Sequence, residues 1–189
     1  KRYNLIMFLS IFFIFGEEAV MAKAYETRDE IPQEYKWNLS DIYKSWDLWK
    51  KDYNKAETMV NDLATYKGKL SDKKVFLEFL DKQEELDKLS YKLYRYPQLS
   101  RDIDAYDKNS TENLQKVEFL FSKTATELSW VNSEILNIGK DKVLSWTNEK
   151  EFSDYKFGLE NLFRMEKHIL PEEENKLLSY YSQFLSSPR

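Results

Sequence analysis

The sequence offers one histidine, His168, and no cysteine as soft metal ligands. A zinc peptidase site of the H-E-x-x-H type needs two histidines one helical turn apart, plus a glutamate that activates the zinc-bound water. A Ser-His-Asp triad would need the same histidine, and no Gly-rich phosphate loop occurs. His168 is therefore predicted to be a capping or packing residue. Paired carboxylates such as Glu84 and Glu85 are expected by chance. The sequence assigns no catalytic, cofactor-binding or metal-binding residue to this chain.

An acidic segment at residues 100–109 invites comparison with a calcium-binding loop. Asp102, Asp104 and Asp107 supply carboxylates, but the EF-hand loop requires Asn or Asp at its fifth position and Gly at its sixth. This chain has Tyr106 and Asp107 there. The segment is therefore predicted to be a solvated turn between helices, with acids that cap a helix.

Two groups of aromatic residues have both a functional and a structural interpretation. Tyr91, Tyr94, Arg95 and Tyr96 suit a groove that binds an extended peptide through aromatic faces and a cation, but core packing is favoured. The tryptophans raise the question of sugar binding. Most lie on apolar helix stripes, which favours packing in the core or between domains. They are Trp37, Trp46, Trp49, Trp130 and Trp146.

Composition limits the class of protein. The 189 residues are 42% hydrophobic and 33% charged, with only four glycines and four prolines, which favours a single all-α domain. The net charge is −4 and the lysines are interleaved with acids, so the chain has no basic face and is not expected to bind nucleic acid. The absence of cysteine excludes a disulfide scaffold and fits a reducing compartment.

Residues 1–24 form a leader with two interpretations. Lys1 and Arg2 precede an apolar run at residues 5–15, which is shorter than a membrane span, and residues 22–24 fit a signal-peptidase site. Alternatively, these residues are translated upstream DNA that ends before a start at Met21. Purine-rich codons for residues 16–18 would then form the ribosome-binding sequence. The second interpretation is preferred and predicts a cytoplasmic protein, whereas the first predicts export.

Local signals predict the first helices. Residues 25–44 are predicted to be an extended aromatic segment in which regular structure begins only after Pro32. This segment is expected to pack as a belt on the helices that follow. A helix is predicted at residues 45–65 from an apolar three-four spacing, with Gly68 as its left-handed cap. The next begins at Ser71 or Asp72, runs either as one helix or as two pieces divided near Asp81, and is ended or kinked by Pro97.

Further helices are predicted toward the C-terminus. One unbroken helix should run from Ser110 or Thr111 to residue 138, with Phe121 on its inward stripe, followed after Gly139 by a short helix at residues 140–146. Ser153 should cap another. Pro171 and the acids at residues 172–174 should start the last, whose inward stripe contains Leu177, Leu178, Tyr181, Phe184 and Leu185. The fold expected for residues 45–189 is an antiparallel array of about six helices.

Three segments resemble the oligoendopeptidase F family of zinc metallopeptidases, which are related to thimet oligopeptidase. They are EIPQEYKWNLSDIYK at residues 30–44 with YKGKL at 66–70, LYRYPQL at 93–99 followed by Asp102 and Asp104, and residues 162–174 from LFR through HIL to EEE. Together they cover residues 30–189. The resemblance implies that this chain is the N-terminal helical lid domain of a longer peptidase.

The same resemblance implies a function for the intact protein. It would hydrolyse short oligopeptides with a zinc-bound water, using two histidines and glutamates supplied by a C-terminal catalytic domain. The present part would roof the substrate groove. The alternative is a non-enzymatic helical module that offers an apolar groove to a partner protein. Neither interpretation assigns a stable membrane span to the chain.

Overall fold

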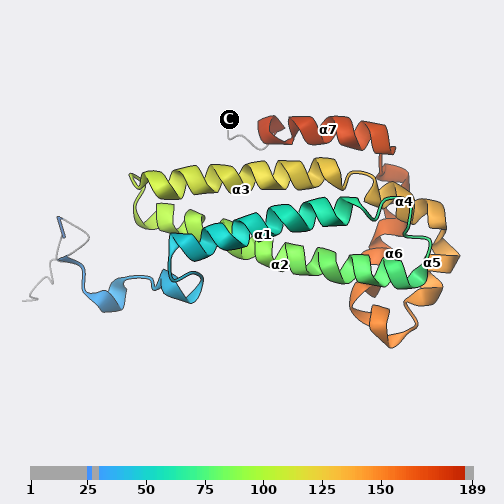
Figure 1. The fold of residues 1–189 in the computed structure, drawn as a ribbon, viewed down its shortest axis with the longest axis horizontal. Coiled ribbons are helices and arrows are strands. Elements are labelled where there is room, and N and C mark those ends of the chain that lie inside the picture. The colour runs from blue at the N-terminus through green and yellow to red at the C-terminus, as the bar shows by residue number, and fades with distance from the viewer. Residues whose placement is uncertain (1–24, 27–29, 186–189) are drawn as a thin grey trace, which may run out of the picture. The chain divides into compact units, whose positions relative to one another are not determined.

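The computed structural model describes residues 25–26 and 30–185, with side chains as far as residue 181. Every regular element in this part of the chain is helical (Figure 1), which confirms the all-α prediction. The leader predicted at residues 1–24 lies outside the described residues, as do the side chains of Phe184 and Leu185. None of the described helices combines the length and apolar character that crossing a membrane would require.

The chain divides into two units, residues 1–37 and residues 38–189. In the first unit, a 3-10 helix η2 (Gln33–Tyr35) follows Pro32, whose backbone is extended at φ −56° and ψ 145°. Tyr35 and Trp37 are exposed.

The second unit begins with a short 3-10 helix that joins the core. Asn38 caps η3 (Leu39–Asp41) by accepting a hydrogen bond from the Ser40 backbone N–H at 3.1 Å. Tyr43 follows in the buried core, and its hydroxyl donates to Asp52 at 2.8 Å. The predicted packing of this segment on the helices is thus confirmed for Leu39, Ile42 and Tyr43.

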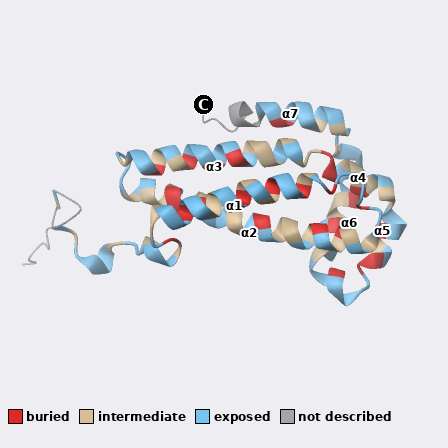
Figure 2. Ribbon diagram, viewed as in Figure 1, coloured by how far each residue is buried: buried red, intermediate tan, exposed pale blue. Residues whose placement is uncertain are grey.

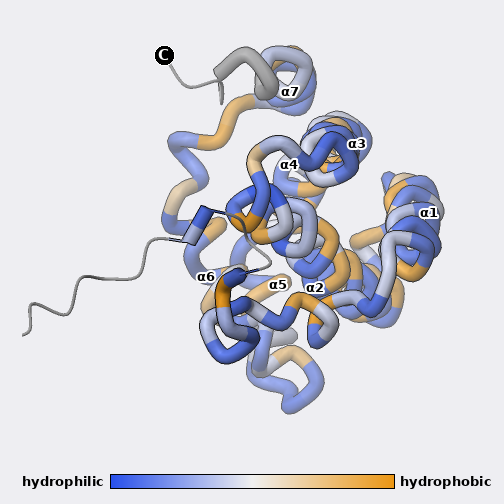
Figure 3. The backbone as a smooth tube through the Cα atoms, turned by 90° about the vertical axis from the view of Figure 1, so that its left-hand side faces the viewer, coloured by the Kyte–Doolittle hydropathy of each residue, from blue (hydrophilic) through white to orange (hydrophobic). Residues whose placement is uncertain are grey.

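Three long helices form the body of the second unit. They are α1 (Trp46–Ala64), α2 (Lys73–Ile103) and α3 (Lys108–Glu127), which pack on one another. The α7 helix (Glu172–Leu185) lies along α3 (Figure 1), on the side away from α1 and α2 (Figure 3). Short turns join α1 to α2 and α2 to α3, so these neighbours run antiparallel. Buried positions recur along α1, α2 and α3 between exposed ones (Figure 2).

Local signals place α1 within one residue of the prediction. Ser45 caps its start, because its hydroxyl accepts the Leu48 backbone N–H at 3.4 Å. The inward stripe contains Trp49, Ala56, Val60 and Leu63, all buried. The helix ends at the C-cap Thr65, so Gly68, at φ +80°, shapes the following turn and does not cap the helix itself.

The α2 helix decides between alternatives that the sequence left open, because it is one helix and Pro97 does not end it. It runs without a break past Asp81 and continues through Pro97 to Ile103. Proline has no backbone N–H, so the carbonyl of Leu93, four residues earlier, loses its helical partner. The indole N–H of Trp49 on α1 donates to that carbonyl at 2.9 Å. This bond between helices replaces the missing helical one, and α2 therefore does not end at Pro97.

The predicted helix at residues 110–138 is two helices, α3 and α4 (Val131–Ile138). In a continuous helix the Glu127 carbonyl would accept from Val131 N–H. Instead it accepts the Trp130 indole N–H at 2.8 Å, and Val131 N–H turns to the Leu128 carbonyl at 3.1 Å. The Trp130 ring is buried against Phe79, with 5.8 Å between ring centroids. Burial of Trp130 accompanies the break.

The start of α3 and its buried stripe also differ from the prediction. The N-cap is Asp107, whose carboxylate accepts the backbone N–H groups of Asn109 at 3.1 Å and Ser110 at 3.2 Å. The helix therefore starts before Ser110. The prediction that acids of the preceding turn cap a helix is confirmed for Asp107. Leu120 takes the buried position, while Phe121 is exposed.

The helices α4, α5 (Lys140–Trp146) and α6 (Lys156–Arg164) follow α3 at one end of the long helices (Figure 1). Gly139, at φ +98°, separates α4 from α5 as predicted. Ser153 lies inside the 3-10 helix η4 (Lys150–Tyr155) and caps nothing, so that prediction is wrong. Another 3-10 helix, η5 (Glu166–His168), precedes α7.

The start of α7 follows the sequence signals. Its first turn contains Glu172, Glu173 and Glu174, which complement the positive end of the helix dipole. The carbonyl of Pro171 accepts the Asn175 backbone N–H at 2.9 Å. Glu172 also forms an ion pair with Lys67 in the turn between α1 and α2.

Candidate functional site

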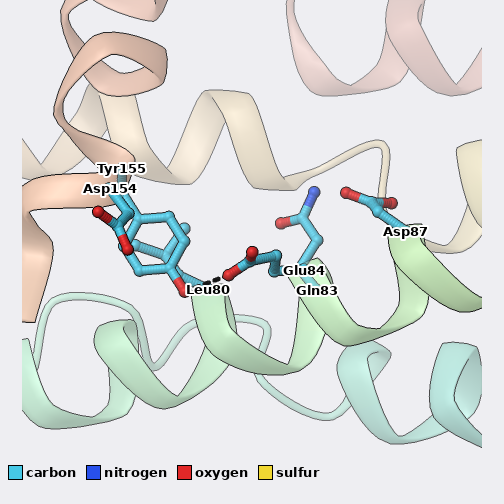
Figure 4. A pocket seen from close by; sticks show the side chains of 6 residues that line it. All are labelled: Leu80, Gln83, Glu84, Asp87, Asp154 and Tyr155. Carbon is cyan, nitrogen blue, oxygen red and sulfur yellow. Dashed lines mark hydrogen bonds between the residues drawn. The ribbon is translucent and has the colours of Figure 1, made fainter.

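An acidic hollow lies between α2 and η4. Its volume is about 340 Å³, and Figure 4 shows carboxylates from both elements around it. The lining residues are Leu80, Gln83, Glu84, Asp87, Asp154 and Tyr155. Positions 80, 83, 84 and 87 fall on one side of a helix because they are three or four residues apart. Only the packing of η4 on α2 adds Asp154 and Tyr155.

Hydrogen bonds across this hollow join η4 to α2. The Tyr155 hydroxyl donates to Asp81 at 2.5 Å and to Glu84 at 3.1 Å. Burial and these carboxylates raise the pKa of Tyr155, so the phenol stays a neutral donor. The hydrogen bond from Lys88, with an N–O distance of 2.5 Å, and the bond from Tyr155 lower the pKa of Glu84. These hydrogen bonds hold η4 against α2, and the group contains no nucleophile paired with a base.

Asp87 in this hollow gives a pH prediction. Partial burial, and then the Glu84 carboxylate, raise the pKa of Asp87 above its ordinary 3.8. A raised folded-state pKa means that stability is lost as the pH rises through that pKa. We expect Asp87→Asn to be more stable than wild type at neutral pH, with the difference vanishing below the ordinary pKa. Urea midpoints across acid and neutral pH measure this. A variant less stable than wild type at neutral pH would contradict it.

The carboxylate pairs named from the sequence do not form a site. Glu84 lines the acidic hollow, whereas Glu85 points to α1 and pairs with Lys55 at 2.6 Å. In the acidic turn, Asp104 accepts the Tyr106 backbone N–H at 2.9 Å. Among the described residues no group of histidine, cysteine or acidic side chains is arranged to hold a metal ion. His168 is exposed on η5 and does not pack in the core.

The aromatic group on α2 is divided between core and surface. Tyr96 is buried, with ring centroids 5.4 Å from Tyr43 and 4.6 Å from Trp46, which confirms core packing for this residue. Tyr91 is exposed, and the Arg95 guanidinium lies 5.0 Å from its ring centroid. The core interpretation is therefore wrong for Tyr91.

The tryptophans mostly belong to the core. Trp49, Trp130 and Trp146 are buried, and Trp46 packs against the same core while partly exposed. Trp37 is exposed in the first unit. Since the three buried rings present no face to solvent, core packing explains them better than sugar binding.

Backbone N–H groups of the turn at residues 66–70 bind a carboxylate. The Glu134 carboxylate on α4 accepts the backbone N–H of Gly68 at 2.7 Å and that of Leu70 at 2.8 Å. This YKGKL turn is one of the segments that carry the family resemblance. Its backbone amides therefore bind a carboxylate of the same chain, which ties the α1–α2 turn to α4.

Removal of this carboxylate should be costly. We expect Glu134→Ala to lower the free energy of unfolding by about 1–3 kcal/mol, because two backbone N–H groups lose their acceptor and one of them is partly buried. Glu134→Gln retains one acceptor oxygen and should lose less. Chemical denaturation followed by circular dichroism measures both, with the exposed Glu118→Ala as a control. Equal stability of Glu134→Ala and the control would refute this role.

Comparisons with known proteins show which family of proteins this chain is similar to. The sequence model of the family described as Oligopeptidase F matches residues 134–189. Oligopeptidase PepF of Bacillus subtilis is 30% identical over 172 residues, which is 90% of this chain and 26% of that protein. This chain is related to the N-terminal region of the oligoendopeptidase F family. An oligoendopeptidase F homolog of Borreliella burgdorferi is 29% identical over 85% of this chain and 27% of its own length.

A solved structure supports the fold. The crystal structure of oligoendopeptidase-F from Enterococcus faecium matches with a TM-score of 0.66 and 20% identity, over 74% of this chain and 28% of that chain. At this identity the likeness shows the fold alone. The chain spans about a quarter of the length of the curated relatives that it matches.

Proposed function

We propose that this chain is the N-terminal helical part of a zinc metalloendopeptidase that hydrolyses short oligopeptides. The observation that carries the proposal is the similarity of nearly the whole chain to about a quarter of Oligopeptidase PepF. Its catalytic residues would then lie in the remaining part of such a protein. The lone histidine and the absence of cysteine agree with this division, because this chain offers too few of the usual zinc ligands.

The contribution of the present part would be to roof the substrate groove. Packed helices joined by short turns make a rigid wall, and a rigid wall over a deep groove admits extended peptides while it excludes folded proteins. Bonds between distant elements support rigidity here, including Trp49 to Leu93 and Glu134 to the α1–α2 turn. The protein would act in the cytoplasm if Met21 is its start.

The reading frame beyond Arg189 tests this proposal. We expect it to continue for several hundred residues and to encode H-E-x-x-H on a helix, as a peptidase of this type requires. The full product should cleave a fluorogenic oligopeptide and lose that activity with a chelator. A stop codon at this point in the intact gene would instead favour the non-enzymatic interaction module.

Metal binding by the isolated chain is a separate prediction. With one histidine and no cysteine, the 189-residue chain should bind no stoichiometric zinc and show no peptidase activity. Isothermal titration with zinc measures this. Tight binding of one equivalent that disappears in His168→Ala would contradict the expectation.

A further inference from the structure

The α7 helix packs on α3 through its polar side. Ser179 is buried there, and its hydroxyl lies 2.8 Å from the hydroxyl of Thr126 on α3. Ordinarily an amphipathic helix turns its apolar side toward the core. Here the contact with α3 is made on the side of Ser179, so the other side of α7 faces away from the body of the unit.

That outward side is apolar. Leu177 and Tyr181 are 57% and 55% exposed, and one helical turn separates them. Leu178 and Tyr180 flank them at 48% and 55% exposure. We define these four residues as the α7 outer face. Single exposed apolar residues are ordinary, but a contiguous group on one helix marks an interaction surface.

The orientation of α7 is held at its start. Glu172 pairs with Lys67 of the α1–α2 turn, and the Asn175 side-chain amide donates to the Leu170 carbonyl at 2.6 Å. Rotation of α7 to bury Leu177 would take Ser179 away from Thr126. The apolar residues therefore remain outside for as long as these contacts persist.

We propose that the α7 outer face is the surface on which the remaining part of the peptidase docks. This inference rests on the proposed function. The occupant follows from length, since the match covers only 26% of Oligopeptidase PepF and about three quarters of such a protein lie outside it. Two of the four residues are tyrosines, which place an apolar ring and a hydroxyl at one surface and are typical of protein interfaces.

Cysteine labelling tests the proposal, because the 189 residues contain no cysteine. Leu177→Cys and Tyr181→Cys are made in this chain and in the full product of the gene, and mass spectrometry follows maleimide labelling of the peptide that carries each cysteine. Both sites are exposed in this chain, so the variants should fold. At protein concentrations low enough to keep the 189-residue chain monomeric, we expect labelling at least about tenfold slower in the full product than in that chain. The matched control Phe157→Cys, at a side chain 79% exposed on α6, should change by less than about twofold.

The outcomes separate this inference from the proposed function. Equal labelling of residues 177 and 181 in both proteins would overturn the docking proposal, and the proposed function would stand if the full product still cleaves peptides. Slow labelling in a full product that cleaves no peptide would support docking and overturn the proposed function. A reading frame that ends at Arg189 would overturn both.

Discussion

Trp49→Ala is expected to lower the free energy of unfolding by about 3–5 kcal/mol, the usual cost of deleting a large buried aromatic ring. Trp49→Phe should cost about 1–3 kcal/mol, because the Leu93 carbonyl, which has lost its usual helical donor at Pro97, then also loses the indole donor. The Trp49 side chain is 1% exposed, and its indole N–H donates to that carbonyl at 2.9 Å. Urea denaturation followed by circular dichroism measures both variants.

A double-mutant cycle isolates the hydrogen bond from the packing of the ring. Pro97→Ala restores a backbone N–H that the Leu93 carbonyl can accept. The penalty of Trp49→Phe should therefore shrink in the Pro97→Ala background, while the loss of ring packing is the same in both. Equal penalties in the two backgrounds would show that Trp49 acts through packing alone.

The chain produced from Met21 onward is expected to be helical and to form dimers or larger species through the α7 outer face. Contiguous apolar surface without a partner drives association, because burial removes it from water. Leu177→Asp combined with Tyr181→Asp should shift the population to monomer, since it puts a charge on both central residues of that face. Size-exclusion chromatography with light scattering over a range of concentrations measures the change.

Two controls show whether this effect is specific. Phe157→Asp alters an apolar side chain on α6 that is even more exposed, at 79%, and should leave association unchanged. Trp130→Asp should unfold the chain instead of dispersing it. Trp130 is 3% exposed and packs on Phe79, so a charge there cannot be accommodated in the folded chain. A wild-type chain that is monomeric at every concentration and binds no hydrophobic dye would contradict the association prediction.

The sequence by itself determined the elements whose signals are local. The three-four stripe of α1 and the glycine at residue 139 predicted boundaries that the structure confirms to within a residue. These signals work because capping bonds and helical periodicity involve residues at most a few positions apart.

Only the tertiary structure decided where distant residues replace local partners. The Trp49 indole carries α2 through Pro97, and burial of Trp130 accompanies the break between α3 and α4. In the acidic hollow, Tyr155 reaches Asp81 from η4, far along the chain. For α7 the sequence predicted the apolar stripe but not its direction: Leu177, Leu178 and Tyr181 are exposed, so the prediction that they face inward is wrong. Periodicity shows that a helix has two sides; which side meets the core depends on the polar groups, such as Thr126, that the neighbouring helix presents.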